Sequence, residues 1–371
     1  MSSIHALTMP KWGLSMTEGE VAGWLVAEGT KVGKGTELAE IKTDKILGVL
    51  EAPVPGVLRR TLAGASDMVP VGGLLGILAD SPITDSEIDT YIADFRAHFV
   101  PETEAQSAAS GPETIVVGKH SLRYLRMGNG EEQSLLVHGF GGDLKTWLFN
   151  QQELAADRTV YALDLPGHGG SSKSVGSGNL AELGNVLGAF LDGVGVASAH
   201  VAGHSMGGAI ALELACAHPE RFRSLCLISS AGLGPEVDGE FIQGLITATR
   251  RKEIERQIKK LFAKPMLISR QLVEEVLKYK RLDGVEAALR KIADQFFPGG
   301  RQAVVLRDQL GSLEVPVLVI WGADDRILPA THAQGLSNTV RTEILAGSGH
   351  MVHMEEAAEV NRSIRSFWDS V

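Results

Sequence analysis

Hydrophobic and polar positions change their spacing twice along this chain. In residues 1–79, short apolar runs alternate with polar residues and are punctuated by glycines, a pattern typical of short strands joined by turns. Residues 86–99 have helical spacing, and the acidic, Ser- and Ala-containing segment after them predicts a flexible linker. From about residue 114, apolar strands alternate with helical patterns, which predicts a mostly parallel sheet with helices on both faces.

These changes predict a multidomain protein. We expect an all-β domain over residues 1–79, a helix and acidic linker over 80–113, and an α/β domain over 114–371. Between Gly234 and about Leu310, helical segments interrupt the alternation of strands and helices. Residues 235–310 are therefore expected to form a helical cap over the α/β domain.

The all-β segment contains an internal repeat. An offset of 36 residues matches four pairs of apolar positions, namely Val21 with Val57, Val32 with Met68, Leu38 with Leu74 and Ile41 with Ile77. A domain rich in Val and Gly gives some matches by chance, but one shared offset favours two similar half-units. We therefore predict a sandwich of two sheets with quasi-twofold symmetry.

Lys45 lies at the junction of the two half-units. The alternating runs 38–42 and 46–51 read as strands, and Thr43-Asp44-Lys45 between them is short enough for a tight hairpin. A lysine at an exposed tip is open to a modifying enzyme from all sides, as a covalent carrier arm requires. The alternative is an unmodified turn lysine.

Composition excludes several classes of function. A formal net charge of -10 argues against general nucleic-acid binding. Cys216 and Cys226 lie in apolar runs outside any CxxC or Cys/His cluster, so neither a metal site nor a redox pair is expected. The first residues show no signal-peptide pattern and no apolar run is long enough to span a membrane, so we expect a cytoplasmic protein without a membrane partner.

Ser205 is the candidate nucleophile of the α/β domain. The sequence Gly203-His204-Ser205-Met206-Gly207 matches G-x-S-x-G and lies between a predicted strand, 199–202, and a predicted helix, 207–217. A serine on this strained strand-to-helix turn requires small flanking residues, which the glycines supply. The oxyanion is expected to bind the backbone amides of Met206 and of Phe140, the latter in the loop 138–142.

The acid and the base are expected later in the chain. Asp325 follows the apolar strand 316–321 at G-x-x-D spacing, with Asp324 as its competitor. His350 follows the strand 341–345, with His353 as its competitor. The predicted triad is thus Ser205, His350 and Asp325.

Two resemblances to known families extend these predictions. The motifs MPKWGLSMTEGEV, EGTKVGKG, AEIKTDK and APVPGVL resemble the lipoyl domains of 2-oxo acid dehydrogenase complexes, which implies a barrel-sandwich fold and lipoic acid in amide linkage to Lys45. The related biotinyl domains present Met-Lys-Met where this chain has Asp-Lys-Ile. The motifs HGFGG, DLPGHGGS, GHSMGG, WGADDRI and GSGH, in this order, resemble the α/β-hydrolases and imply the triad and the oxyanion amides named above.

A lipoyl domain followed by an α/β-hydrolase domain resembles the dihydrolipoamide acetyltransferase components of bacterial acetoin-cleaving systems. The resemblance implies acetyl transfer from the arm to coenzyme A, with a thiamine-diphosphate acetoin dehydrogenase (E1) and a dihydrolipoamide dehydrogenase (E3) as partners. The HxxxDG motif of ordinary acyltransferase components is absent, and 81–113 holds no recognisable peripheral-subunit-binding domain. The alternatives are an ester or thioester hydrolase tethered by its carrier domain, and a carrier whose second domain is only a scaffold.

The predicted cap is basic in an acidic chain. Residues 250–307 contain 15 Lys or Arg and 7 Asp or Glu, a net charge of +8. This charge is either the solvated face of amphipathic helices or an anion-steering rim, which would attract the phosphates of coenzyme A or dock the acidic N-terminal half of the chain. The coenzyme A version predicts that neutralising Lys259, Lys260 and Lys280 raises the KM for coenzyme A.

Overall fold

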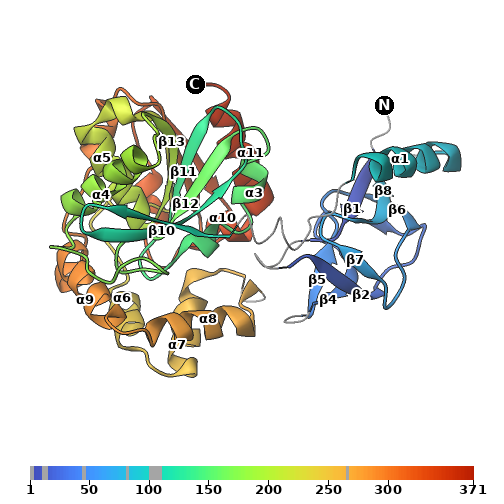
Figure 1. Ribbon diagram of the computed structural model, residues 1–371, viewed down its shortest axis with the longest axis horizontal. Helices are drawn as coiled ribbons and strands as arrows, with labels where there is room; N and C mark the ends of the chain where they lie inside the picture. Colours follow the sequence, from blue (N-terminus) through green and yellow to red (C-terminus); the bar gives the residue numbers. More distant parts are fainter. Residues whose placement is uncertain (1–3, 11–15, 44–46, 81–82, 100–110, 265–266) are drawn as a thin grey trace. The chain divides into compact units, whose positions relative to one another are not determined.

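The computed structural model describes residues 4–10, 16–43, 47–80, 83–99, 111–264 and 267–371, and the chain forms two compact units, Met1–Gly111 and Pro112–Val371 (Figure 1). Each unit has a hydrophobic core of its own. The boundary between them lies close to the domain boundary expected from the sequence.

The first unit is a sandwich of two four-stranded antiparallel sheets with the strand orders β1-β8-β6-β3 and β5-β4-β2-β7. The strands are β1 (Ile4–Thr8), β2 (Glu18–Trp24), β3 (Lys31–Val32), β4 (Glu37–Lys42), β5 (Leu47–Glu51), β6 (Gly56–Thr61), β7 (Met68–Pro70) and β8 (Leu74–Ala79). The 36-residue offset takes β2, β3 and β4 onto β6, β7 and β8, so each sheet repeats the strand order of the other. The predicted repeat is therefore confirmed.

Side chains from both halves of the repeat fill the space between the two sheets. Val21 and Ile41 from one half, and Leu58 and Leu75 from the other, are fully buried. They belong to a single apolar cluster, so neither half-unit has a core without the other.

The predicted helix is confirmed as α1 (Asp85–His98), which packs on the first unit. Its N-terminus has a capping box formed by Thr84 and Glu87. Ile88 and Ile92 form a small buried cluster with Ile77 of β8. Arg60 of β6 pairs with Asp85 at 2.8 Å and also with Asp89. The remainder of the predicted linker, residues 100–110, lies outside the described residues.

The second unit is built on an eight-stranded sheet with the order β16-β15-β14-β13-β11-β12-β10-β9. The strands are β9 (Glu113–Val117), β10 (His120–Met127), β11 (Gln133–Val137), β12 (Thr159–Leu163), β13 (Ala199–His204), β14 (Phe222–Ile228), β15 (Val317–Gly322) and β16 (Val340–Leu345). The pairings among β11 to β16 are parallel, and β9 and β10 are antiparallel. The central strands β12, β13 and β15 are buried along their whole length, as expected of parallel strands covered on both faces.

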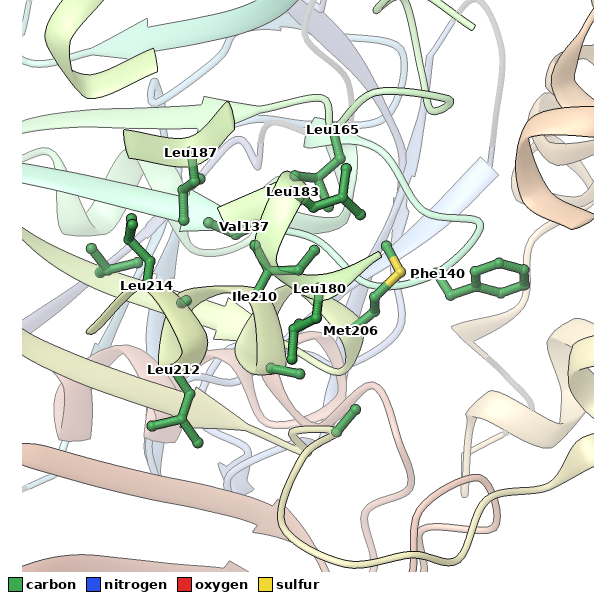
Figure 2. Packing of buried hydrophobic residues seen from close by; sticks show 14 of the residues in the cluster. Val137, Phe140, Leu165, Leu180, Leu183, Leu187, Met206, Ile210, Leu212 and Leu214 are labelled. Atoms are coloured by element: carbon green, nitrogen blue, oxygen red, sulfur yellow. The ribbon is translucent and has the colours of Figure 1, made fainter. Parts of the chain in front are cut away.

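Helices cover both faces of this sheet (Figure 1). In that view α4 (Leu180–Gly193) and α5 (Met206–Ala217) lie on one side of it, and α3 (Gln151–Leu154) and α11 (Ala357–Trp368) on the other. Figure 2 shows the core on the first side, where Leu183 and Leu187 of α4 belong to the same buried cluster as Ile210 of α5. The mostly parallel, doubly covered sheet predicted from the sequence is confirmed.

The predicted cap lies between β14 and β15. It consists of α6 (Gly239–Thr247), α7 (Arg251–Leu261), α8 (Arg270–Lys280) and α9 (Val285–Phe296). Ile254 and Ile258 of α7 are buried in one cluster with Val273 and Leu277 of α8. Met351, which follows the predicted catalytic histidine, belongs to the same cluster, so the cap packs directly against that loop.

Candidate active site

Ser205 occupies the strained turn predicted for the nucleophile. It lies between β13 and α5 with φ 53° and ψ −120°, a backbone conformation that a non-glycine residue adopts at some energetic cost. The flanking glycines are required because their neighbours leave no room. A Cβ on Gly203 would lie 2.6 Å from the carbonyl oxygen of Gly207, and one on Gly207 would lie 2.4 Å from that of His138.

Asp325 and His350 form a buried pair at the ends of β15 and β16. The Nδ1 of His350 lies 2.8 Å from Oδ2 of Asp325, and both side chains are almost inaccessible to solvent. The other carboxylate oxygen, Oδ1, accepts the backbone amides of Ile327 at 2.8 Å and Leu328 at 3.0 Å. These three bonds fix the plane of the carboxylate, whereas Asp324 is exposed.

His353, the competing histidine, lies deeper in the molecule. It is fully buried, with its ring centroid 4.5 Å from that of His204 and 4.6 Å from that of Trp147. Burial lowers the pKa of His353 to about 3, and the neighbouring His350 acts in the same direction. His353 is absent from the lining of the cavity described next, so the geometry favours His350 as the base.

Ser205 and His350 line one cavity of about 140 Å³. Phe140, from the predicted oxyanion loop, lines it as well. Its remaining walls are mostly apolar and come largely from the cap, including Phe241, Ile242, Leu245, Ile258, Leu261, Phe262, Leu272, Val276 and Phe297. A reaction at Ser205 therefore takes place in a largely apolar site.

The loop after β11 passes against the nucleophile. A Cβ on Gly139 would lie 2.9 Å from the Cβ of Ser205, so only glycine fits there. Met206 is the first residue of α5, and the first amides of a helix have no partner within the helix. These positions support the assignment of the Phe140 and Met206 amides as oxyanion donors, which stays a prediction.

Asp143 lines the same cavity and was not singled out from the sequence. It directly follows HGFGG, and its carboxylate accepts the amide of Lys145 at 2.9 Å. Burial, reinforced by the neighbouring Asp164, raises the pKa of Asp143 to about 6. Asp164 itself is held by Arg123 at 2.6 Å and by the amide of Leu144 at 2.7 Å.

The three cap lysines named above have other partners. Lys260 pairs with Asp238 at 2.8 Å and with Glu240 at 2.9 Å, and Lys259 pairs with Glu255 at 2.8 Å. Lys280 donates to the carbonyl of Ile246 at 2.6 Å, and burial lowers its pKa. These partners offset much of the charge that the three lysines would present to an anion, and the effect of neutralising them on the KM for coenzyme A stays a prediction.

Other parts of α7 keep exposed cations. Lys252 and Arg256 are exposed and lie four residues apart on that helix. They are among the exposed cap cations, with Arg270, Lys278, Arg281 and Lys291, on which an anion-steering rim could be built.

Lys45, the predicted carrier lysine, lies outside the described residues. Its flanking strands are nevertheless antiparallel partners, with Lys42 of β4 opposite Leu47 of β5. The strands on both sides of residues 43–46 are thus paired, and the hairpin tip with its lipoyl-bearing lysine stays a prediction.

The described residues meet neither the requirements of a metal site nor those of a membrane-spanning helix. The described residues contain no group of three or more His, Cys, Asp or Glu side chains placed to hold a metal ion. Among the same residues, no helix combines the length and apolar character needed to cross a membrane.

Comparison with known proteins agrees with this architecture. Residues 135–357 match the model of the alpha/beta hydrolase fold family, and residues 5–78 match the model described as biotin-requiring enzyme. The fold and site thus define an α/β-hydrolase-fold protein with an N-terminal biotin/lipoyl-type domain. This chain belongs to the family of dihydrolipoyllysine-residue acetyltransferase components of acetoin cleaving systems.

Two relatives establish that membership. The component from Pseudomonas putida is 47% identical over 369 residues, which cover 99% of each chain. The component from Cupriavidus necator is 42% identical over 98% of this chain and 97% of its own. Both matches therefore extend over the first and the second unit.

Solved structures match the larger part of this chain. A bacterial membrane phospholipase A has a TM-score of 0.62 at 26% identity, covering 77% of this chain and 96% of its own. The meta-cleavage product hydrolase CumD has a TM-score of 0.64 at 18% identity, covering 70% of this chain and 98% of its own, and shows the fold alone.

Proposed function

We propose that this chain is a dihydrolipoyllysine-residue acetyltransferase of acetoin breakdown, which moves an acetyl group from a lipoyl arm on Lys45 to coenzyme A. The observation that supports this proposal best is the near-full-length match to two relatives that bear this name. The buried pair of His350 and Asp325 beside the cavity of Ser205 supplies the chemistry that such a transfer requires.

The first half of the proposed reaction forms an acyl-serine. When attached, the lipoyl arm presents the acetyl group as a thioester. Ser205 Oγ attacks the carbonyl carbon while His350 Nε2 takes the hydroxyl proton, and Asp325 holds the imidazole in the required tautomer. The amides of Phe140 and Met206 bind the oxyanion. As the carbon–sulfur bond breaks, His350 returns the proton to the departing sulfur.

The second half transfers the acetyl group onward. His350 takes the proton of the coenzyme A thiol, and the sulfur attacks the carbonyl carbon of the acyl-serine. The Ser205 oxygen leaves and recovers its proton from His350, so that the enzyme is regenerated and a new thioester is formed. The apolar cap residues around Ser205 support this outcome, because they limit the access of competing water to the acyl-serine.

The complex that supplies the acetyl group is part of the proposal. The relatives are named as components of an acetoin cleaving system, which implies a multi-enzyme assembly. We propose a thiamine-diphosphate acetoin dehydrogenase (E1) as the enzyme that loads the arm, and a dihydrolipoamide dehydrogenase (E3) as the enzyme that reoxidises it.

Product analysis tests this function. Purified protein is given acetyl-dihydrolipoamide with and without coenzyme A, and acetyl-coenzyme A and free acetate are measured. We expect acetyl-coenzyme A as the main product, and a loss of at least ~10⁴-fold in Ser205→Ala. Acetate released at one rate regardless of coenzyme A would instead support a hydrolase. That second candidate rests on the resemblance of the α/β unit to a 2-hydroxy-6-oxononadienedioate hydrolase, at 31% identity over 66% of this chain.

A further inference from the structure

Glu355 joins the cap to the loop that holds His350. It is the last residue of α10 (Val352–Glu355), and its side chain is buried. Its Oε1 accepts the backbone amide of Gly349 at 2.7 Å. Its Oε2 accepts the amides of Ala263 and Lys264, both at 2.9 Å. One buried carboxylate thus satisfies three backbone donors from two segments that are far apart in the sequence.

A second link connects the same two segments. The amide of Met351 donates to the carbonyl of Leu261 at 3.1 Å. Gly349 and Met351 are the two neighbours of His350, so the end of α7 is bound to the chain on both sides of the base. The contact is also close: a Cβ on Gly349 would lie 2.7 Å from the nitrogen of Ala263 and 2.9 Å from the oxygen of Leu261.

Two further hydrogen bonds join His350 to residues of the second unit that lie outside the cap. Asp325 accepts from its Nδ1, and the Nε2 of His204 donates to its backbone carbonyl at 3.0 Å. The side of the loop that faces the cap is held by Glu355 and by the carbonyl of Leu261. Leu261 and Phe262 line the cavity with Ser205, so the part of the cap that lines the candidate site is bonded directly to the loop of the base.

We infer that Glu355 is a positioning residue that couples the seating of cap residues 261–264 to the orientation of His350. The inference rests on the proposed role of His350 as the base. A carboxylate is suited to this task because it has lone pairs for three amide donors and no hydrogen of its own. Glutamine cannot replace it, since its amide nitrogen would face at least one of these N–H groups. The variant would lose either the bond to Gly349 or the bonds to the cap.

The test compares Glu355→Gln with Glu359→Gln, a control on α11 that leaves the network intact. Three quantities are measured: kcat and KM with acetyl-dihydrolipoamide and coenzyme A, the rate at which a fluorophosphonate labels Ser205, and the thermal unfolding midpoint. For Glu355→Gln we expect kcat and the labelling rate to fall together by about 10- to 100-fold, because a small misplacement of a catalytic group has effects of that size. We expect KM to stay within about twofold of its original value, and the control to behave as the unsubstituted protein.

A second variant keeps the inference testable if Glu355→Gln does not fold. Glu355→Asp keeps the charge but shortens the side chain, so it reaches only one of the two segments, and the same parallel fall is expected. The inference is overturned if either variant, folded at the assay temperature, keeps kcat and labelling within twofold, or if KM rises while kcat is unchanged. If the fluorophosphonate does not label Ser205 in the unsubstituted protein, the proposed nucleophile itself is contradicted, and with it the role of His350. This result differs from unchanged labelling in the Glu355 variants, so a failure of the proposed function can be told from a failure of the inference about Glu355.

Discussion

Asp325 contacts His350 through one carboxylate oxygen and the backbone of its own turn through the other. Oδ2 lies 2.8 Å from His350 Nδ1, and Oδ1 accepts the amides of Ile327 and Leu328. The acid is therefore fixed before substrate binds. Because the acceptor faces Nδ1, it favours the tautomer in which Nε2 is free to take a proton from Ser205.

Asp325→Asn should lower kcat by about 10³- to 10⁴-fold, because an amide can turn its N–H₂ toward Nδ1 and impose the wrong tautomer. The oxygen of the substituted side chain would still accept the amides of Ile327 and Leu328, so the fold should persist. Asp324→Asn is the matched control, since Asp324 is exposed, and should keep kcat within a fewfold. Steady-state kinetics of both variants provide the measurement. Equal losses in the two would contradict the assignment of Asp325.

Gly207→Ala should destabilise the second unit rather than merely slow the reaction. The new Cβ would lie 2.4 Å from the carbonyl oxygen of His138 and 2.5 Å from that of Val137, and neither backbone atom can move without disturbing β11. We expect a loss of about 1–3 kcal/mol or more in the free energy of unfolding, measured in urea. Gly195→Ala tests the opposite case, since open space surrounds its Cβ and only a positive φ opposes it. We expect a smaller loss of unfolding free energy for Gly195→Ala than for Gly207→Ala. A larger loss for Gly195→Ala would contradict this prediction.

Asp143→Asn should change how stability depends on pH. Burial first, and Asp164 second, raise the pKa of Asp143 from 3.8 to about 6, so the folded protein binds this proton more tightly than the unfolded chain does. The stabilising contribution is complete below about pH 4 and is lost as the pH rises to about 6. Relative to the unsubstituted protein, the Asn variant should therefore gain on the order of 2–3 kcal/mol between pH 4 and pH 7.

Urea unfolding at several pH values checks this prediction, with Asp157→Asn as a control of opposite sign. A side-chain hydrogen bond from Arg158 lowers the pKa of Asp157, so its contribution is present above its unfolded pKa and is lost as the pH falls. The Asp157 variant should consequently lose stability relative to the unsubstituted protein as the pH rises. Parallel pH curves for the Asp143 variant and the unsubstituted protein would contradict the assignment for Asp143.

Lys260→Ala should weaken the cap without changing the recognition of coenzyme A. Removing this lysine leaves Asp238 and Glu240 without their cation, at an expected loss on the order of 1 kcal/mol in unfolding free energy. Neutralising Lys252 and Arg256 together should instead raise the KM for coenzyme A by a fewfold at low salt, and the effect should fade as salt is added. An unchanged KM for coenzyme A in the double variant would contradict a steering role for Lys252 and Arg256 and would indicate that they belong to a solvated helix face.

Lys45→Arg should separate the two units functionally. It removes the predicted attachment site but leaves Ser205 and His350 untouched. We expect turnover of free acetyl-dihydrolipoamide to remain within about twofold, while turnover that depends on the carrier domain is lost. Intact mass spectrometry of the protein from its native host reports the lipoyl group directly. An equal loss with the free and the attached substrate would argue against a carrier role.

Much of the site was predictable because its signals are local. Ser205 stands between glycines in a strand–turn–helix, Asp325 follows a buried strand at fixed spacing, and His350 follows the next strand. The 36-residue repeat predicted the correspondence of the strands in the first unit for a similar reason, since equal patterns build equal elements. The choice of Asp325 over Asp324 and of His350 over His353 also agrees with the geometry.

What could not be predicted depends on contacts across the fold. Glu355 accepts hydrogen bonds from amides about 90 positions away in the sequence, and no sequence pattern near it predicts these contacts. Asp143 became notable only through its burial beside Asp164. The pairing of Lys260 with Asp238 likewise depends on how α6 and α7 pack. A count of charges along the sequence therefore overestimated how many cap cations are free.

The duplicated order of strands in the first unit has a mechanical consequence. Exchanging the two halves brings the β4–β5 register, Lys42 opposite Leu47, onto that of β1 and β8, where His5 lies opposite Leu78. The strand ends that flank the predicted attachment site in one sheet thus correspond to the strand ends in the other sheet at which the chain enters β1 and leaves β8. The twofold relation puts these two pairs of strand ends on different sheets, so that a group carried between β4 and β5 would not crowd the chain where it enters and leaves the sandwich.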